Sequence, residues 1–254
     1  MQSDVSLGPS RPFAGTLAFL WTEVLVQGNE RMAMLTSMVV PGIILVFVLI
    51  LNPSLFSIAL VGAIVFSTFT MGQRVLNEAA YLRIDHKAND MYLAGPMMPE
   101  AYFLGMSVGI LVIYLTPTIF LGILATFVVP LHLDVGLLLL AVAATVWLFA
   151  ASTGYVFSTF FRDNRAIWAY SSLFFNVFGV LMPVFYPLGL FPAALRPIAL
   201  LLPPSAAAAL VQAAIGTTTL TSGEVILAVA GLAVETVGVF LFAIYWARRT
   251  VREA

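Results

Sequence analysis

The chain has 254 residues, of which 61% are hydrophobic and only 9% are charged. Soluble domains carry about 25% charged residues, so the composition excludes a soluble globular protein and indicates an integral membrane protein. The net charge of −1 and the lack of a basic tract give no case for nucleic-acid binding, and the absence of cysteine excludes disulfides and thiolate metal sites.

The N-terminal segment 12–31 predicts an amphipathic helix that lies in the membrane interface. Pro12 suits the first turn of a helix, and one apolar stripe is formed by Phe13, Leu17, Leu20, Trp21, Val24 and Leu25. The alternative is that the segment begins the first membrane span, but Glu23, Glu30 and Arg31 disfavour burial in lipid. The first 30 residues also lack the apolar core and cleavage site of a signal peptide, so we expect targeting through the first span.

Six stretches are suitable for a spanning helix, which needs about 20 mostly apolar residues. They are residues 34–51, 55–72, 101–129, 135–160, 166–186 and 225–247. Pro41, Pro117 and Pro183 fall inside them and are expected to kink the helices. We therefore predict an all-α membrane protein with six transmembrane helices in one domain, residues 1–254.

The distribution of positive charge predicts the orientation of these spans. Six spans place both termini on one side, and that side holds ten of the eleven basic residues, namely Arg11, Arg31, Arg74, Arg83, Lys87, Arg162, Arg165, Arg248, Arg249 and Arg252. The other side holds only Arg196. The positive-inside rule therefore places both termini in the cytoplasm, with the protein in the cell membrane.

The segment 73–100, between the second and third predicted spans, contains the stretch "KANDMYLAGPMMPEAYFLGM" from Lys87 onward. Apolar residues recur at helical spacing, as Leu76, Ala80, Ile84, Ala88 and Met91. Pro96 forces Gly95 out of helical geometry, which ends the helix near Leu93, and Pro99 with Glu100 suits the start of the third span. We predict a short, stiff docking helix on the cytoplasmic side, because a solvated loop that only fixed topology would need neither the apolar stripe nor the Gly-Pro stop.

The segment 187–224 is too apolar for an exposed loop and too broken for a span, since six of the chain's 14 prolines lie between Pro183 and Pro204. We predict two short helices, at about 192–202 and 205–215, that dip into the outer leaflet, with Ser205 as the N-cap of the second. Irregular backbone at that depth must be buried against protein, so this element should cover the outer end of the bundle.

No motif for catalysis is present. H-E-x-x-H, G-x-S-x-G, a glycine-rich dinucleotide turn and a P-loop are all missing from the sequence, although each has a recognisable spacing. The two histidines, His86 and His132, lie on opposite sides of the predicted membrane and cannot share a metal ion. We expect a non-catalytic chain that binds no cofactor and does not hydrolyse ATP itself.

The arrangement resembles the type-2 permease family of ATP-binding-cassette (ABC) exporters. That family has an interfacial helix before six spans, a coupling helix between spans two and three, and a broken re-entrant segment between spans five and six. The most specific similarities are "KANDMYLAGPMMPEAYFLGM" and "PVFYPLGLFPAALRPIALLLPPS". The coupling region departs from the family in carrying Asp85-His86-Lys87 where members more often have Arg-Glu and Gly-Thr.

The resemblance implies a half-transporter. Two permease chains, identical or paralogous, would enclose a shared pathway in the lipid bilayer, and two ABC ATPase subunits that bind ATP would dock beneath them and drive export. The residues expected to couple to the ATPase are Arg83, Asp85, Lys87, Asp90, Gly95 and Pro96. Spans two and five line the pathway in the family, which makes Tyr170, Phe174, Asn176 and Phe178 candidate pathway residues, although lipid-facing or core packing is an equally good explanation for each ring.

The nature of the substrate and two other functions stay open at this point. An amphipathic, lipid-like or drug-like molecule is favoured as the cargo, because the spans carry few charges, and a glycan comes second. The alternative to an exporter is a membrane channel or scaffold with no ATPase partner, although no selectivity-filter sequence supports a channel. An intramembrane enzyme comes third, because no paired catalytic groups face each other across the spans.

Glu235 lies near the centre of the sixth predicted span. A carboxylate there costs about 2.5–3.5 kcal/mol on insertion scales, so a lipid-facing, unpaired position is disfavoured. Gly231 and Gly238 lie on the same side of that helix, where small residues let another helix approach. We predict that Glu235 is buried at such a contact and forms a structural hydrogen bond there, ahead of the alternative that it is a polar site on the substrate route.

Overall fold

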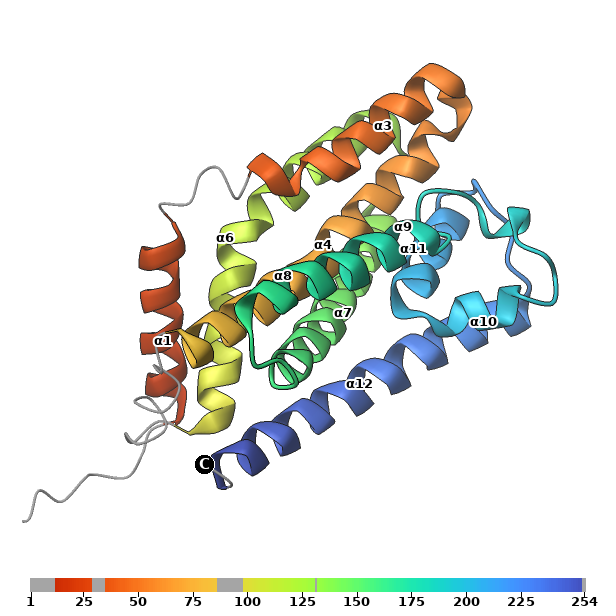
Figure 1. The fold of residues 1–254 in the computed structure, drawn as a ribbon. Helices are drawn as coiled ribbons and strands as arrows, with labels where there is room; N and C mark the ends of the chain where they lie inside the picture. Colours follow the sequence, from red (N-terminus) through yellow and green to blue (C-terminus); the bar gives the residue numbers. More distant parts are fainter. Residues whose placement is uncertain (1–11, 29–34, 86–97, 131, 253–254) are drawn as a thin grey trace, which may run out of the picture.

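The computed structural model describes residues 12–28, 35–85, 98–130 and 132–252, and within these ranges the chain is helical, with no strand. Figure 1 shows a bundle of long helices with α1 (Pro12–Gln27) at one end and α10 (Arg196–Leu201) at the other. The protein therefore has the all-α architecture that its composition predicts.

Four helices of the described chain are long and apolar enough to cross a membrane. They are α4 (Phe56–Ile84), which follows the 3₁₀ turn η1 (Pro53–Leu55), α6 (Pro99–Val128), α7 (Leu133–Ser158) and α12 (Ser222–Arg252). They coincide with the second, third, fourth and sixth predicted spans. Helices of this length and apolarity indicate a membrane-embedded protein.

The first and fifth predicted spans are shorter or interrupted, so the count of six stays a prediction. The first contains α3 (Val39–Leu51), part of an apolar helical segment that starts at Leu35. The fifth is divided into α8 (Asn164–Ser172), a π-helical turn η2 (Leu173–Val177) and α9 (Phe178–Leu181). Pro183 does not kink a continuing helix as predicted, because the helix ends at Leu181, whereas Pro117 does lie inside α6.

Helix α4 is the central element of the bundle. It is mostly buried and packs against α3, α6, α7, α8 and α11. The α4–α7 crossing is especially close, because a Cβ atom on Gly154 would overlap the backbone carbonyl of Gly72, and one on Gly72 would overlap that of Ala150. Small residues allow this backbone approach between helices.

The second predicted span was expected to end at residue 72, but α4 continues to Ile84. No glycine or proline interrupts residues 73–84, so nothing breaks the helix there. The predicted helical spacing is confirmed as far as Ile84, but the helix is not separate from the span. Leu76 and Ala80 are buried within the bundle, and Ala88 and Met91 lie outside the described residues.

The predicted N-terminal helix is confirmed as α1, which packs against α6. Its inner face carries Phe19 and Glu23, which meet α6 at Gly105 and Gly109, respectively. Part of the predicted apolar stripe faces away from the bundle: Leu17, Trp21 and Leu25 are 56%, 62% and 59% exposed, while Glu23 is only 4% exposed. An outward apolar stripe is what a helix in the membrane interface needs.

Two short helices, α10 and α11 (Pro203–Ala214), form in the proline-rich segment as predicted. The second begins at Pro203, because proline is favoured in a first helical turn, so Ser205 is a buried residue inside the helix rather than its N-cap. Helix α11 packs against α4, α7 and α12. The burial against protein is therefore confirmed for α11, whereas most of residues 189–198 are exposed, and the depth of the segment in a membrane stays a prediction.

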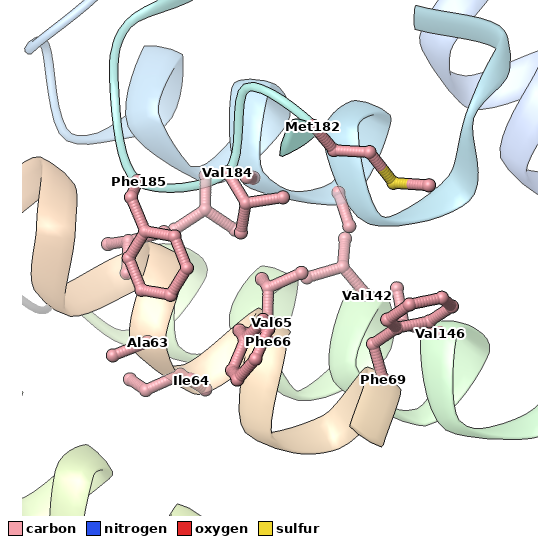
Figure 2. Close-up of a cluster of buried hydrophobic side chains, with 14 of the residues drawn as sticks. Ala63, Ile64, Val65, Phe66, Phe69, Val142, Val146, Met182, Val184 and Phe185 are labelled. Carbon is pink, nitrogen blue, oxygen red and sulfur yellow. The ribbon is translucent and has the colours of Figure 1, made fainter. Parts of the chain in front are cut away.

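Figure 2 shows the core where the chain after α9 crosses over α4 and α7. Phe66 of α4 packs against Phe185 with 5.3 Å between ring centroids, and Val142 and Val146 of α7 complete the cluster. A Cβ atom at Gly62 would overlap the carbonyl group of Val184. The segment after α9 is thus packed closely against α4 at Gly62 and Phe66.

Candidate functional site

A cavity of about 430 Å³ opens beside α4, between the chain at α3, helix α6 and the α8–η2 segment. Its lining is unusually polar for an apolar bundle and includes Thr36, Ser37, Ser67, Thr70, Gln73, Arg74, Ser172 and Asn176. Polar groups are costly inside an apolar bundle unless they are paired or used, so their concentration here makes this cavity the candidate functional site.

One face of α4 supplies half of these polar side chains. Ser67, Thr70, Gln73 and Arg74 recur at intervals of three or four residues, which places them on one side of a helix. The Thr70 hydroxyl donates to the Ser67 carbonyl at 3.0 Å. The Ser67 hydroxyl is buried and has no hydrogen-bond partner within the described chain.

The opposite wall is built by the π-helical turn. Asn176 Nδ2 donates to Gln73 Oε1 at 3.0 Å and to Ser172 Oγ at 3.2 Å. A π turn inserts one extra residue into a helix and often occurs at functional sites. Here it lies directly beside the polar face of α4, and the two walls are joined by side-chain hydrogen bonds.

Arg74 is the only charged side chain that lines the cavity, counting described residues. Its guanidinium lies 4.8 Å from the centroid of the Tyr114 ring on α6, a cation–π arrangement. Tyr114 is 4% exposed, so the cation is held against a buried ring. From the sequence, Arg74 was counted as a cytoplasmic charge in the predicted docking segment 73–100, and its place after the apolar residues 58–72 was the signal that could have revealed it.

A second, apolar groove of about 220 Å³ lies on another face of α8 and η2. It is lined by Leu76, Phe157, Phe161, Tyr170, Ser171, Leu173, Phe174 and Phe178. Tyr170 stacks on Phe161 at 5.7 Å, and Phe174 contacts Phe157 at 5.1 Å and Phe178 at 5.3 Å between ring centroids. We call this the aromatic groove.

The structure separates the four candidate pathway residues. Tyr170, Phe174 and Phe178 line the aromatic groove, whereas Asn176 lines the polar cavity. A buried hydrogen bond from Ser171 Oγ to Asn77 Oδ1, at 2.9 Å, fastens α8 to α4. Gln73 and Arg74 were not predicted as residues of the polar cavity, because the sequence assigned them to a loop.

Of the predicted coupling residues, Arg83 is the best defined. Its guanidinium donates to the carbonyl oxygens of Thr159 at 2.9 Å, of Phe161 at 2.7 Å, and of Ser158. The last carbonyls of a helix have no partner inside the helix, so Arg83 caps the C-terminal end of α7 and holds the end of α4 to it. Asp85 is exposed just beyond, and Lys87, Asp90, Gly95 and Pro96 lie outside the described residues.

Two further contacts tie the same end of the bundle together. Trp246 Nε1 on α12 donates to Thr159 Oγ1 at 2.9 Å. Arg248 pairs with Glu100, in the first turn of α6, at 2.8 Å. With Arg83, these contacts connect α4, α6, α7 and α12 at one end.

Glu235 lies on α12 with intermediate exposure, and its carboxylate makes no hydrogen bond or ion pair within the described chain. The predicted close contact exists at Gly231, where a Cβ atom would lie 3.4 Å from the Leu200 carbonyl oxygen, but Gly238 faces open space. The hydrogen bond expected of Glu235 is therefore not seen, and its role stays a prediction.

The described residues hold no group of three or more His, Cys, Asp or Glu side chains placed to bind a metal ion. No protein-family model matches the chain, and no curated protein is significantly similar to it. The function proposed below therefore rests on the geometry of this molecule and on the resemblance described above.

Proposed function

We propose that the chain is the permease subunit of an ABC exporter, which moves an amphipathic, lipid-like or drug-like molecule, or a glycan, out of the cytoplasm. The observation that supports this most is the polar cavity of about 430 Å³ beside α4. A bundle that only anchored other proteins would gain nothing from gathering the half-buried Arg74, Gln73 and Asn176 around a cavity, because such groups are costly in a membrane.

The contact that Arg83 makes with α7 supports the proposal that a separate ATPase drives transport. Helix α4 lines the cavity from Phe66 to Arg74 and continues to Ile84. Because Arg83 fastens that end to α7, a force applied to the chain after Ile84 would move two central helices together. An ATPase that docks on the segment with Asp85, Lys87, Asp90, Gly95 and Pro96 could thus change the cavity's shape.

In the complete assembly, α3 serves as the first span and α8–α9 as the fifth, which gives six spans with both termini in the cytoplasm. Six spans form one half of the transporter, so a second permease chain, identical or paralogous, completes the pathway in the cell membrane. Two ATPase subunits bind ATP beneath the pair.

The experiment is purification of the tagged chain with an ABC ATPase encoded beside its gene. We expect the ATPase to be retained in equal numbers with the permease, and a combined Asp85, Lys87 and Asp90 alanine variant to lose transport while its expression is kept. A chain that retains no ATPase and still conducts its cargo without ATP would instead be the alternative channel or scaffold.

A further inference from the structure

An apolar groove continues the polar cavity along the same two helices. It has a volume of about 250 Å³ and is lined by Met38, Pro41, Gly42, Leu45, Val46, Leu49, Phe56, Phe120, Leu121 and Leu124. We call it the α3–α6 groove. Its lining holds no charged residue and no side chain with an N–H or O–H donor among the described residues.

The polar cavity and the α3–α6 groove are neighbours along both α3 and α6. On α6, Tyr114 and Pro117 line the polar cavity, and Leu121 and Leu124 line the groove. Around the start of α3 the two linings overlap, with Val40 in the cavity and Met38 and Pro41 in the groove, and from Pro41 the groove extends to Leu49, roughly 12 Å further at 1.5 Å per residue. The two spaces thus lie next to each other between α3 and α6, and the groove extends beyond the cavity.

We propose that this combined site binds an amphiphile that carries one anionic headgroup on an acyl chain, with the headgroup in the polar cavity and the chain in the α3–α6 groove. The described lining of the cavity contains the positive charge of Arg74 and no acidic side chain.

The hydrogen-bonding groups suit such a headgroup. Arginine forms charge-assisted bonds with phosphate and carboxylate oxygens, and Arg74 is the charged side chain of the described lining. Gln73 and Asn176 are already bonded to each other at 3.0 Å, so they form a fixed wall rather than a second binding group. A described lining with one cation and no acidic side chain therefore favours an anionic headgroup over a neutral glycan.

The identification of this amphiphile as the cargo rests on the proposed export function. The proposal that the site binds it does not depend on export. Binding is therefore measured on the purified chain without an ATPase. Native mass spectrometry would compare lysophosphatidate, a fatty acid and lysophosphatidylcholine at equal concentration, which present a phosphate, a carboxylate and a zwitterionic head on similar chains. We expect one anionic amphiphile per chain to be retained about tenfold better than the zwitterion, and equal retention of all three would overturn the proposal.

Arg74→Gln should abolish that preference, and Arg74→Lys should keep part of it, because lysine retains the charge but not the planar fork. Arg249→Gln is the matched control, since Arg249 also lies over an aromatic ring, at 5.7 Å from the Trp246 centroid, but outside the cavity. Loss of the preference in Arg249→Gln but not in Arg74→Gln would show surface binding and overturn the site.

The acyl chain is tested by filling the groove. A Cβ atom added to Gly42, which lines the groove, would have no other atom within 4 Å, and the same holds for Gly122 of α6, which lies outside the groove. Gly42→Phe should lower the retention of every acyl ligand about tenfold, and Gly122→Phe should not. If the two variants had equal effects, the acyl chain would not lie in the α3–α6 groove. The same conclusion would follow if an equal concentration of inorganic phosphate displaced lysophosphatidate.

These outcomes separate the two proposals. Selective binding by a chain that retains no ATPase would leave the site standing and refute export, whereas ATPase-driven transport without anionic selectivity would refute the site alone.

Discussion

The α8–η2 segment has two faces that differ in kind, the polar cavity on one side and the aromatic groove on the other. In the cavity, Asn176 and Gln73 bind each other directly, and Arg74 lies over the buried ring of Tyr114. In the groove, Tyr170 and Phe178 are 58% and 49% exposed and contact other rings. The cavity has directional groups that can select a ligand, whereas the groove offers apolar area that lipid or a second chain can cover. We therefore propose the polar face, rather than the aromatic face, as the functional one.

The largest expected effect comes from separating α4 from α7, which would disrupt both faces together. Gly154→Leu would force a side chain into the backbone of Gly72. Overpacking typically costs about 1–3 kcal/mol and sometimes more, and here the obstacle is backbone, so we expect the upper end of that range and a low yield of monodisperse protein. Gly136→Leu is the control, because Gly136 has open space around it. Equal thermal stability of the two variants in detergent would contradict the close crossing.

The next largest effect concerns the cavity alone. Asn176→Leu removes the half-buried hydrogen bond to Gln73, and a typical intramolecular hydrogen bond contributes about 0.5–1.5 kcal/mol. We expect a modest loss of stability but at least a tenfold loss of transport, measured in proteoliposomes with the ATPase. Phe178→Leu on the aromatic face is the comparison. If both variants transported equally well, the assignment of function to the polar face would fail.

Arg83 connects the cavity helix with α7, and its loss should uncouple them. Arg83→Gln removes charge-assisted bonds to the last carbonyls of α7, each hydrogen bond to a charged group being worth about 1.5–3 kcal/mol. We expect a lower thermal midpoint and ATP hydrolysis that no longer responds to cargo. Arg162→Gln, an exposed arginine beyond α7, should change neither quantity. An unchanged cargo response in Arg83→Gln would show that the connection does not transmit movement.

The aromatic groove should tolerate substitution better. Tyr170→Leu removes the stacking contact with Phe161, and such pairs contribute about 0.5–1.5 kcal/mol beyond their buried area. We expect a small shift in thermal midpoint and normal transport per assembled protein. A Tyr170→Leu protein that is assembled but inactive would place the pathway in the groove instead.

The smallest effect is expected at Glu235, which has no bonded partner in the described chain. Glu235→Gln should assemble and transport almost normally. Glu235→Leu removes the polar group, and a loss of stability of this variant in detergent would show that the polar group stabilises α12. A stable Glu235→Gln protein without transport would identify a functional carboxylate on a helix distant from both faces of α8.

The long helices could be predicted from the sequence because each is a continuous apolar run. The α8–η2–α9 segment could not, since a π turn leaves no signal in hydropathy and Pro183 marks a helix end as readily as a kink. Asn176 was identified through the resemblance to a family, but its partner Gln73 was not. The apolar run ends before Gln73, and hydropathy cannot distinguish a loop from a helix whose polar face borders a cavity.

In the coupling region, too, the sequence pattern predicts the helix but not what the helix packs against. The helical spacing of Leu76, Ala80 and Ile84 was predicted correctly, but the spacing does not say whether a stripe covers a partner or the bundle. The structure shows that Leu76 and Ala80 are buried inside. Arg83 likewise caps a helix about 75 residues away in the sequence, a contact that no local pattern could reveal.

If the protein is an ATPase-driven permease that binds its cargo at the polar face of α4, cargo should stimulate ATP hydrolysis through that face. The most direct test measures cargo-stimulated ATP hydrolysis by the reconstituted complex, comparing the native chain with Arg74→Gln and Phe178→Leu. We predict that stimulation is lost in Arg74→Gln, with basal hydrolysis retained, and is preserved in Phe178→Leu. Stimulation that survives in Arg74→Gln and disappears in Phe178→Leu would contradict the proposed binding site and the function built on it.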